Sequence, residues 1–432
     1  MHEPFAPDQL LAFYLDHLQN VLLPFWRERA MDEEYGGYFT CFENSGERLL
    51  STDKFTWSQG RMVWVLAKLA TLPHLAPAER ERYLRWAAAG ADFLQRHCLL
   101  PNGHCAFLLD RQGNPKPQEP GQALDSSAYA DCFVILGLSR YARTSGEEAP
   151  LEFARRLYAS VVQRAQEGTF KTEPYPTPKG YRVHGIPMIL LNVSQELAQA
   201  LRERDDPSAA QVEARAEAFK DDILQHFVHA DLVQEMITTE NRPEWETLLG
   251  RYINPGHTLE DMWFILHQAM AREDRKVVEQ AARIIIKTFQ VGWDETFGGL
   301  FLFVDREGGQ PRGSIAGLAE EKMVHKVRND WDSKLWWPHS EALYTTLLAY
   351  HLTGDPEFLA LYRRVADYTF ATFPHPDPKI GEWIQIRDRQ GRPEQKVVAL
   401  PVKDPFHILR NVILIIELLD TMLANPTPTA GA

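Results

Sequence analysis

Two histidines at the starts of apolar helical runs stand three residues before another ionisable side chain. His257 precedes Glu260 in NPGHTLE, and His407 precedes Arg410 in DPFHILR. Residues three apart on a helix lie on the same face, so each imidazole would be presented together with a charged neighbour. A neutral imidazole can remove or return a proton near neutral pH. The repeated pattern predicts general acid–base chemistry, although a single histidine at a helix start is more often a cap or a packed core residue.

Arg61 and Glu341 are two further charged residues in otherwise apolar or aromatic surroundings. Arg61 lies in WSQGRMVW, and we expect it to face a cavity rather than a surface ion pair. Glu341 lies in the apolar run that follows KLWWPHS, where an unpaired charge would be costly, so it is expected to be functional or ion-paired. The same runs supply four more candidate binding residues: Trp57, Gln59, Trp336 and Trp337. A place in the packed core is an equally good interpretation of Trp336 and Trp337. We interpret the other histidines considered as structural: His184, His325 and His339.

These residues stand at the starts of helical segments that recur along the chain. Apolar runs with helical periodicity begin near residues 57, 125, 187, 257, 335 and 406. Charge-rich amphipathic helices, several with proline in the first turn, begin between them near residues 8, 77, 150, 207, 273 and 356. This alternation predicts an all-α (α/α)6 barrel, or toroid, of six inner and six outer helices. We expect residues 1–432 to form a single catalytic domain, with the inner helix starts around one mouth.

Short aromatic–glycine segments punctuate the repeat. They occur at 35–39, 102–107, 297–303 and 380–383, and they predict short β-hairpin tips on one face of the barrel. The charged segment 312–330 is interpreted as an excursion that folds over the mouth, with a floppy insertion as the alternative.

Composition excludes several classes of function. A net charge of −13 disfavours nucleic acid as a partner, because an acidic surface repels phosphate backbones. No apolar stretch is long enough to cross a membrane and no secretory signal is visible, so the expected compartment is the cytoplasm. The four cysteines make no disulfide framework, and the spacing of His97, Cys98, His104 and Cys105 fits no standard zinc site. We expect neither a metal nor another cofactor.

Four motifs together resemble the N-acylglucosamine 2-epimerase superfamily. They are WSQGR (57–61), INPGHTLE (253–260), KLWWPHSEA (334–342) and FHILR (406–410), in order over nearly the whole chain. Members of that superfamily are (α/α)6 barrels that include N-acyl-D-glucosamine 2-epimerases, cellobiose 2-epimerases, and mannose isomerases and epimerases. The resemblance implies that Arg61 is the substrate arginine, that His257 and His407 are the acid/base pair, and that Glu260 and Glu341 are the accompanying carboxylates.

The third inner helix distinguishes branches of that superfamily. Disaccharide epimerases carry a His-x-His pair there, whereas this sequence has Leu191 and Val193 with Asn192 between them. The segment looks like the N-acyl branch, and Asn192 becomes a candidate substrate-binding residue. Two features depart from the N-acyl enzymes. Those enzymes tend to have a glycine- and lysine-containing lead into the last histidine, whereas this chain reads LPVKDPFH. The segment before KLWW is also longer here than in the N-acyl enzymes.

The resemblance implies a cofactor-free epimerisation at C2 of an aldose, with N-acyl-D-glucosamine and N-acyl-D-mannosamine as the expected pair. One histidine would remove the C2 proton, Arg61 would stabilise the enediolate, and the other histidine would return a proton on the opposite face. Rival interpretations are an aldose–ketose isomerase, a 2-epimerase of mannose or cellobiose, a glycosidase that uses Glu260 and Glu341, and a non-catalytic binding protein. A small sugar is the expected partner, and a homodimer is a possible assembly.

Overall fold

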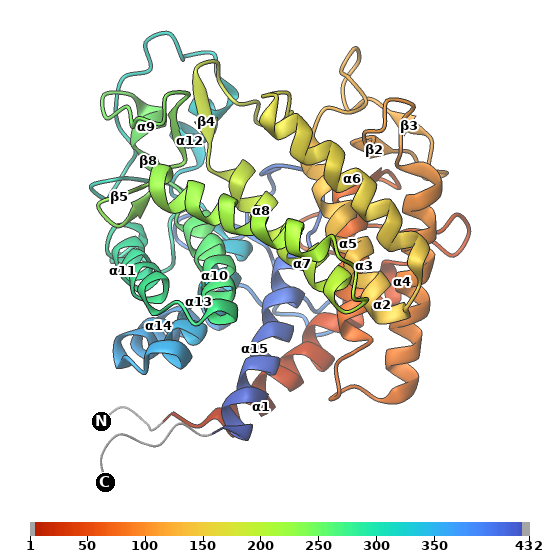
Figure 1. The fold of residues 1–432 in the computed structure, drawn as a ribbon. Helices are drawn as coiled ribbons and strands as arrows, with labels where there is room; N and C mark the ends of the chain where they lie inside the picture. The colour runs from red at the N-terminus through yellow and green to blue at the C-terminus, as the bar shows by residue number, and fades with distance from the viewer. Residues whose placement is uncertain (1–4, 426–432) are drawn as a thin grey trace.

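The computed structural model describes residues 5–425, in which helices dominate. Within that range, six helices pack against one another in a closed ring, each beside the next and the last beside the first. These inner helices are α3 (Thr56–Leu69), α5 (Ala128–Ser145), α7 (Gly185–Arg202), α10 (Pro255–Arg272), α13 (Trp336–Thr353) and α15 (Phe406–Ala424). The first of them follows the N-terminal helices and the last ends the described chain, so the ring joins both ends of the sequence (Figure 1).

An outer helix packs on each inner helix. The outer layer consists of α1 (Pro7–Asp16) with its continuations η1 (His17–Leu22) and α2 (Leu23–Arg29), α4 (Pro77–His97), α6 (Glu148–Gln166), α8 (Ala209–Asp222) continued by η2 (Ile223–Phe227), α11 (Arg275–Gly292) and α14 (Pro356–Thr372). The predicted (α/α)6 barrel is confirmed. That one domain spans residues 1–432 stays a prediction, and its ends lie outside the described residues.

Burial follows the distinction between inner and outer helices that the sequence predicts. From Trp336 to Ala349, every residue of α13 except Trp337 is buried, as expected of a helix surrounded by others. On α11, burial is confined to a stripe at helical spacing that includes Ala281, Ile284, Ile285 and Thr288. Close approach between inner helices needs glycine in places: a Cβ on Gly60 of α3 would meet the Phe133 carbonyl oxygen of α5 at 2.3 Å.

Short antiparallel strands connect the helices at one end of the barrel. The pairs are β1 (Lys54–Phe55) with β2 (Leu108–Leu109), which also pairs with β3 (Pro115–Lys116); β4 (Tyr181–Val183) with β7 (Met236–Thr238); β5 (Val228–His229) with β6 (Leu232–Val233); β8 (Tyr252–Ile253) with β9 (Val304–Asp305); and β10 (Lys334–Leu335) with β11 (Ile386–Arg387). In Figure 1, β2, β3, β4 and β8 lie in the upper part, with the short helices α9 (Leu248–Arg251) and α12 (Lys322–Asp330). In the same view, the start of α1 and the end of α15 lie in the lower part.

The four aromatic–glycine segments are tight turns, each closed by a single β-bridge rather than by paired strands. The bridges join Met31 with Tyr38, Leu99 with Cys105, Trp293 with Leu300, and Pro374 with Trp383. The four segments are thus the predicted tips, each with one antiparallel bridge, and the paired strands are formed by other residues. The reason is backbone geometry: Gly36–Gly37 and Gly298–Gly299 all have positive φ, which ends pairing after one bridge.

Buried ion pairs fasten two of these turns to the starts of inner helices. Asp32 accepts from Lys54, which lies two residues before α3, at 2.9 Å, and Arg111 bonds the same carboxylate at 3.0 Å. Asp294 is held in the same way by Lys334, before α13, and by Arg389. The repeated arrangement fixes where α3 and α13 begin, and therefore where their first side chains point.

The segment 312–330 contributes α12, and its Met323 and Lys326 line the cavity at the inner helix starts. This agrees with the prediction that the segment reaches the mouth. No helix within residues 5–425 is both long and apolar enough to cross a bilayer.

Candidate active site

A cavity of about 260 Å³ lies at the end of the barrel where the inner helices begin. Its walls are mostly aromatic and aliphatic, which suits a site with a few orienting polar groups. The ionisable and amide side chains that line it are Arg61, Glu235, Asn254, His257, Glu260, Lys326, Asp404, His407 and Arg410. These residues come from segments far apart in the chain.

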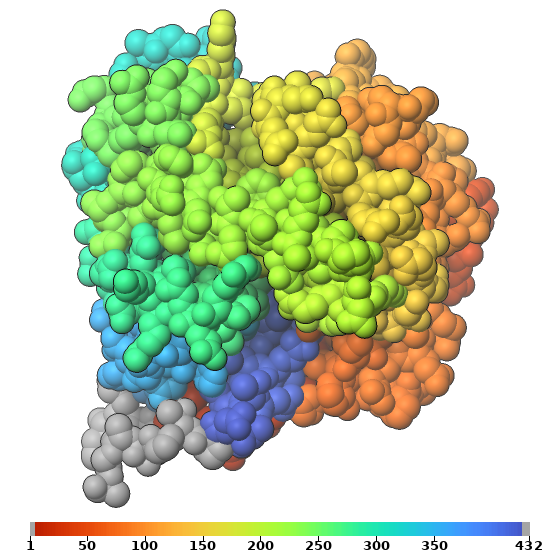
Figure 2. All heavy atoms as spheres, viewed as in Figure 1, coloured from red at the N-terminus to blue at the C-terminus, as the bar shows by residue number. Residues whose placement is uncertain are grey.

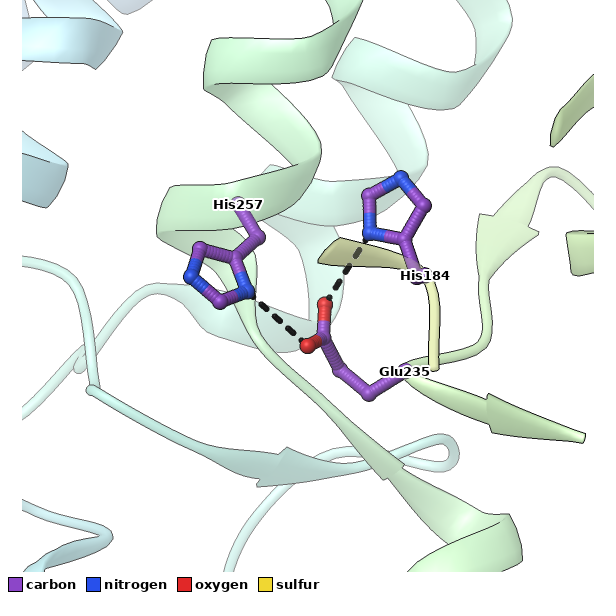
Figure 3. A group of neighbouring side chains, drawn as sticks. All are labelled: His184, Glu235 and His257. Carbon is purple, nitrogen blue, oxygen red and sulfur yellow. Dashed lines mark hydrogen bonds and ion pairs between the residues drawn. The ribbon is translucent and has the colours of Figure 1, made fainter. Parts of the chain in front are cut away.

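His257 reaches the cavity from the first turn of α10. Asn254 caps this helix, its side-chain oxygen accepting from the His257 backbone N–H at 3.2 Å, and Pro255 occupies the first helical position. The NPGH motif is therefore first a helix start, which explains why the imidazole stands at the rim. Its side chain is 33% exposed, and Nδ1 lies 2.9 Å from Oε2 of Glu235. Within residues 5–425, Nε2 has no hydrogen-bond partner, and Figure 3 shows it pointing away from Glu235.

His407 enters the same cavity from α15 but is nearly buried. Its Nδ1 lies 2.6 Å from Oε1 of Glu341, and its Nε2 lies 3.4 Å from Nη2 of Arg61. Burial alone would raise the pKa of Glu341, but Arg410 and His407 outweigh it and hold that pKa at about 2. Glu341 is therefore a carboxylate, the Nδ1–H of His407 donates to it, and Nε2 carries the lone pair.

Arg61 is held flat by aromatic rings. Its guanidinium carbon lies 4.7 Å from the Trp57 ring centre and 4.1 Å from that of Phe133. Burial lowers the pKa of Arg61, while the carboxylate of Asp404, 3.3 Å from Nη1, acts in the opposite direction. Since arginine stays protonated in proteins, the site keeps a fixed cation beside Nε2 of His407.

Trp337 packs against both imidazoles. Its ring centre lies 5.2 Å from that of His257 and 5.6 Å from that of His407. Gly256 allows this position, because a Cβ there would meet Cη2 of Trp337 at 2.5 Å. The glycine of INPGH thus has a packing reason, and the cavity brings two imidazoles into contact with one indole.

Arg410 lines the cavity and bonds two carboxylates. Its Nη2 donates to Oε1 of Glu260 and, at 2.6 Å, to Oε1 of Glu341. Arg410 is only 2% exposed, so its charge is neutralised inside the barrel rather than presented to solvent. Glu260 lines the cavity beside it, whereas Glu341 lies behind His407 and Arg410.

Two predicted binding residues lie elsewhere. Gln59 is fully buried, and its amide bonds the Tyr38 backbone at both ends, accepting from the N–H at 2.7 Å and donating to the carbonyl at 2.9 Å. Asn192 lines a second cavity of about 780 Å³ at the other end of the barrel. The structure thus corrects both placements, because Gln59 faces a turn and Asn192 lies one helical turn beyond the site-lining Met188 and Ile189. The remaining predicted residues, Trp57, Trp336 and Trp337 among them, line the first cavity or contact residues that do.

The second cavity opens in the view of Figure 2, where α15 is visible between the turn that follows α7 and the turn that follows α10. Its cations are paired with carboxylates: Lys68 with Glu417 at 2.8 Å, and Arg143 with Glu196 at 2.8 Å. Arg410 lines both cavities and separates them.

Sequence reasoning missed Asp404 and Glu235. Asp404 lies in the quoted DPFH run, and its position just before a helix, where aspartate commonly caps, was an available signal. Its carboxylate accepts weakly from the Phe406 and His407 N–H groups while pairing with Arg61. Glu235 lies between β6 and β7, and only its occurrence in the apolar stretch LVQEMI could have drawn attention to it.

Two clusters have the ligand types and spacing of a metal site: His184 with Glu235 and His257, and Glu260 with Glu341 and His407. In each, a protein cation already balances the carboxylates, namely the imidazolium of His184 or the guanidinium of Arg410. The donor atoms are thus engaged in ion pairs within the chain.

The family model for N-acylglucosamine 2-epimerase (GlcNAc 2-epimerase) matches residues 37–410, which include every motif residue of the cavity. The chain belongs to this family. Membership makes it a carbohydrate epimerase. The chain is 31% identical over 416 residues to the human N-acylglucosamine 2-epimerase, covering 94% of this chain and 90% of that protein. It is 30% identical over 429 residues to the bovine enzyme of the same name, covering 98% and 92%.

Disaccharide enzymes are more distant relatives of this epimerase. A cellobiose 2-epimerase of Dictyoglomus turgidum is 20% identical over 419 residues, covering 93% of this chain and 97% of that one. A solved cellobiose 2-epimerase from Bacillus thermoamylovorans superposes with a TM-score of 0.75 at 19% identity, covering 95% of this chain and 100% of that chain. A solved D-mannose isomerase has a TM-score of 0.74 at 16% identity, covering 96% and 100%. These structures establish the shared barrel.

Proposed function

We propose that this epimerase interconverts N-acyl-D-glucosamine and N-acyl-D-mannosamine by moving the proton at C2 of the open-chain sugar. The observation that carries the proposal is the pair of imidazoles that line one cavity and contact Trp337, each with Nδ1 against a carboxylate. This arrangement gives each ring a free or exchangeable Nε2. Two such bases meet the need of an inversion, in which a proton leaves one face of carbon and another arrives on the opposite face.

The C1 carbonyl acidifies the neighbouring C2 proton. Nε2 of one histidine takes that proton, and the electron pair moves onto C1 and its oxygen to form an enolate, since C2 of this substrate carries an amide nitrogen. Arg61 is the cation placed to stabilise the developing oxyanion, since its guanidinium lies beside Nε2 of His407. The second imidazolium then returns a proton to the other face of C2. No other oxidant, reductant or group carrier is needed.

The apolar walls support a sugar that carries an acyl group. Trp57, Trp336 and Trp337 line the cavity and offer ring faces to the apolar side of a sugar, while Glu260 is available to its hydroxyls. The identity to two N-acylglucosamine 2-epimerases at 30–31% favours the N-acyl substrate over a disaccharide. Leu191 and Val193, in place of a His-x-His pair, point the same way.

A glycosidase mechanism is disfavoured by the position of Arg410. Glu260 and Glu341 both accept from the same guanidinium nitrogen, so the two carboxylates enclose a cation rather than a glycosidic bond. Aldose–ketose isomerisation is the nearest alternative, because an aldose with a hydroxyl on C2, such as mannose, would form an enediolate, and its protonation at C1 instead of C2 gives a ketose.

The test is incubation of the purified protein with N-acetyl-D-glucosamine, N-acetyl-D-mannosamine, mannose and cellobiose in deuterated buffer, followed by product chromatography and NMR. We expect each N-acetyl hexosamine to give its C2 epimer with deuterium at C2, and we expect turnover to survive a chelator. Formation of a ketose, or turnover of cellobiose alone, would overturn the substrate assignment. Loss of activity with chelator, restored by a divalent ion, would overturn the cofactor-free mechanism.

The compartment and the partners of the protein are proposed from its cysteines and its net charge. Four cysteines in the described chain are all unpaired and buried, which favours a reducing compartment such as the cytoplasm. A homodimer stays a prediction for sedimentation analysis, and the charge of −13 continues to disfavour nucleic acid as a partner.

A further inference from the structure

Glu235 bridges two imidazoles, only one of which faces the cavity. Figure 3 shows its carboxylate between His257 and His184. Oε2 lies 2.9 Å from Nδ1 of His257, and Oε1 lies 3.4 Å from Nδ1 of His184. Glu235 is 2% exposed and His184 is fully buried, so the second histidine has no access to a substrate.

His184 is bonded at both ring nitrogens to carboxylates. Its Nε2 lies 2.9 Å from Oδ2 of Asp261, opposite the contact with Glu235. Only an imidazolium can donate from both nitrogens. Burial by itself would lower the pKa of His184, but Asp261 and Glu235 outweigh it and raise that pKa to about 10. His184 is therefore a buried cation, which the sequence analysis interpreted only as a structural histidine.

Three separate elements hold this cluster in register. His184 immediately precedes α7, and its backbone N–H donates to the Glu235 carbonyl at 2.9 Å. Glu235 lies between β6 and β7, and Asp261 lies on α10, four residues after His257. The carboxylate of Glu235 is thus fixed by both its backbone and its side chain, and its second oxygen is aimed at His257.

The other ionisable groups near the cluster are neutral or engaged. The phenols of Tyr129 on α5 and Tyr252 on β8 face Glu235, and burial raises the pKa of both. Glu260, on the same helix as His257, bonds Arg410. Across the cavity, Arg61 lies beside His407. Glu235 is therefore the charged group in direct contact with the ring of His257 among the described residues.

We propose that Glu235 is a positioning residue for His257, and that the buried His184 cation keeps Glu235 ionised for that task. The inference rests on the proposed function, in which His257 exchanges protons at Nε2. A carboxylate at Nδ1 fixes the tautomer with the lone pair on Nε2 and stabilises the imidazolium that forms when the proton arrives. Without His184, Glu235 and Asp261 would be neighbouring buried carboxylates, and one of them would take up a proton.

Charge counting shows why the arrangement suits a base. Burial raises the pKa of Asp261, and the His184 cation opposes that rise. With His257 neutral and Asp261, His184 and Glu235 all ionised, the cluster has one net negative charge. Protonation of His257 cancels it. The negative charge of the cluster therefore stabilises the imidazolium that forms when a proton arrives on His257. Burial alone would disfavour that positive charge.

The variant Glu235→Gln tests the proposal. An amide offers one acceptor to two imidazole donors, so His257 must face the NH₂ group or lose its bond, and the Nε2 lone pair is no longer fixed. We expect kcat to fall on the order of 10²-fold with a small change in KM. The acidic limb of the kcat/KM profile should move to lower pH, because the protonated base loses its negatively charged partner.

Glu244→Gln is the matched control. Glu244 follows β7 in the same region and bonds the Tyr181 hydroxyl, without contact to either histidine. We expect its pH profile and kcat to match those of the wild type. If Glu235→Gln remains folded and keeps the wild-type acidic limb, the positioning role is wrong.

A second readout does not depend on turnover. In protein labelled with ¹⁵N-histidine, His184 should stay doubly protonated at pH 8, and His257 should carry its proton on Nδ1. In Glu235→Gln the His257 signals should shift toward the other tautomer or a mixture. If both patterns appear but the wild type epimerises no sugar, the proposed function fails and the hydrogen-bonded assignment stands. If the wild type epimerises but His184 is neutral at pH 8, the inference fails and the function stands.

Discussion

The two histidines of the cavity have similar partners at Nδ1 but different surroundings. His257 is one-third exposed and is backed by a carboxylate, a buried imidazolium and a second carboxylate. His407 is 8% exposed, and its ring lies within 3.4 Å of guanidinium nitrogens of both Arg61 and Arg410. In the proposed mechanism, the first base is assisted by net negative charge. The second base is held between opposed charges.

This difference indicates that the two faces of C2 need not be treated alike. Nε2 of His407 adjoins the cation proposed to stabilise the enolate, whereas Nε2 of His257 has no partner within residues 5–425. In the proposed mechanism, proton transfer at His407 depends on the position of Arg61, and proton transfer at His257 depends on Glu235. Substitutions at either cluster should separate these dependencies.

The largest effect is expected from His257→Asn and His407→Asn. Each variant should lose epimerisation by about 10²–10⁴-fold, the usual contribution of a general acid or base, while substrate binding weakens much less. Each should still exchange the C2 proton of one epimer with solvent deuterium, and the two variants should favour opposite epimers. NMR of both epimers with both variants measures this. Inversion near the wild-type rate in either variant would make that histidine structural.

Arg61→Lys should reduce kcat by roughly 10²-fold, since one lost oxyanion contact has about this value. Lysine keeps the charge but loses the planar group that lies 4.1 Å from the Phe133 ring centre and bonds Asp404. Deuterium exchange should slow for both epimers, unlike the one-sided loss in the histidine variants. Steady-state kinetics with the exchange assay tests this. A one-sided loss would assign Arg61 to His407 alone.

Acid should destabilise both clusters. The pKa values of Glu235 and Glu341 are each about 2 in the folded protein, against about 4.3 for an unfolded glutamate. The unfolded state therefore binds more protons between these values. The stabilisation is complete above about pH 4.3 and is lost as the pH falls toward 2, by at most roughly 3 kcal/mol for each carboxyl.

Urea unfolding at several pH values between 3 and 6 measures this dependence. Glu341→Gln and Glu235→Gln should each give a shallower fall in the free energy of unfolding below pH 4.5 than the wild type. Equal slopes in all three proteins would show that these carboxyls do not titrate as their ion pairs imply.

The smallest effect on catalysis is expected from Asn192→Ala and Gln59→Leu. Asn192 lines the second cavity, so kcat/KM should stay within about twofold of the wild type, the ordinary range for a side chain outside the site. Gln59→Leu should instead lower the free energy of unfolding by about 1–3 kcal/mol, because it leaves buried backbone groups of Tyr38 unpaired. Parallel kinetics and denaturation separate the two. A large rise in KM for Asn192→Ala would restore it to the substrate site.

The sequence by itself predicted the ring of helices and the residues at their starts. Helical periodicity and first-turn prolines are local signals, so α3, α10, α13 and α15 could be placed, with Arg61, His257, Glu341 and His407 on them. A closed ring then requires those starts to meet, because neighbouring inner helices run side by side. The direction of each side chain was less predictable: Gln59 is two residues from Arg61 but faces a turn, and Asn192 lies beyond the site.

Only the tertiary structure decided which charges meet. Arg61 pairs with Asp404 across 343 positions of the chain, His407 with Glu341 across 66, and His257 with Glu235 across 22. Glu235 and His184 lie beside short strands, outside any periodic pattern, so the apolar stretch around Glu235 is the one local signal that sets it apart from surface residues. Their ionisation depends on burial and on partners that the fold brings together, because a charge removed from water is retained only where an opposite charge or hydrogen bonds compensate it.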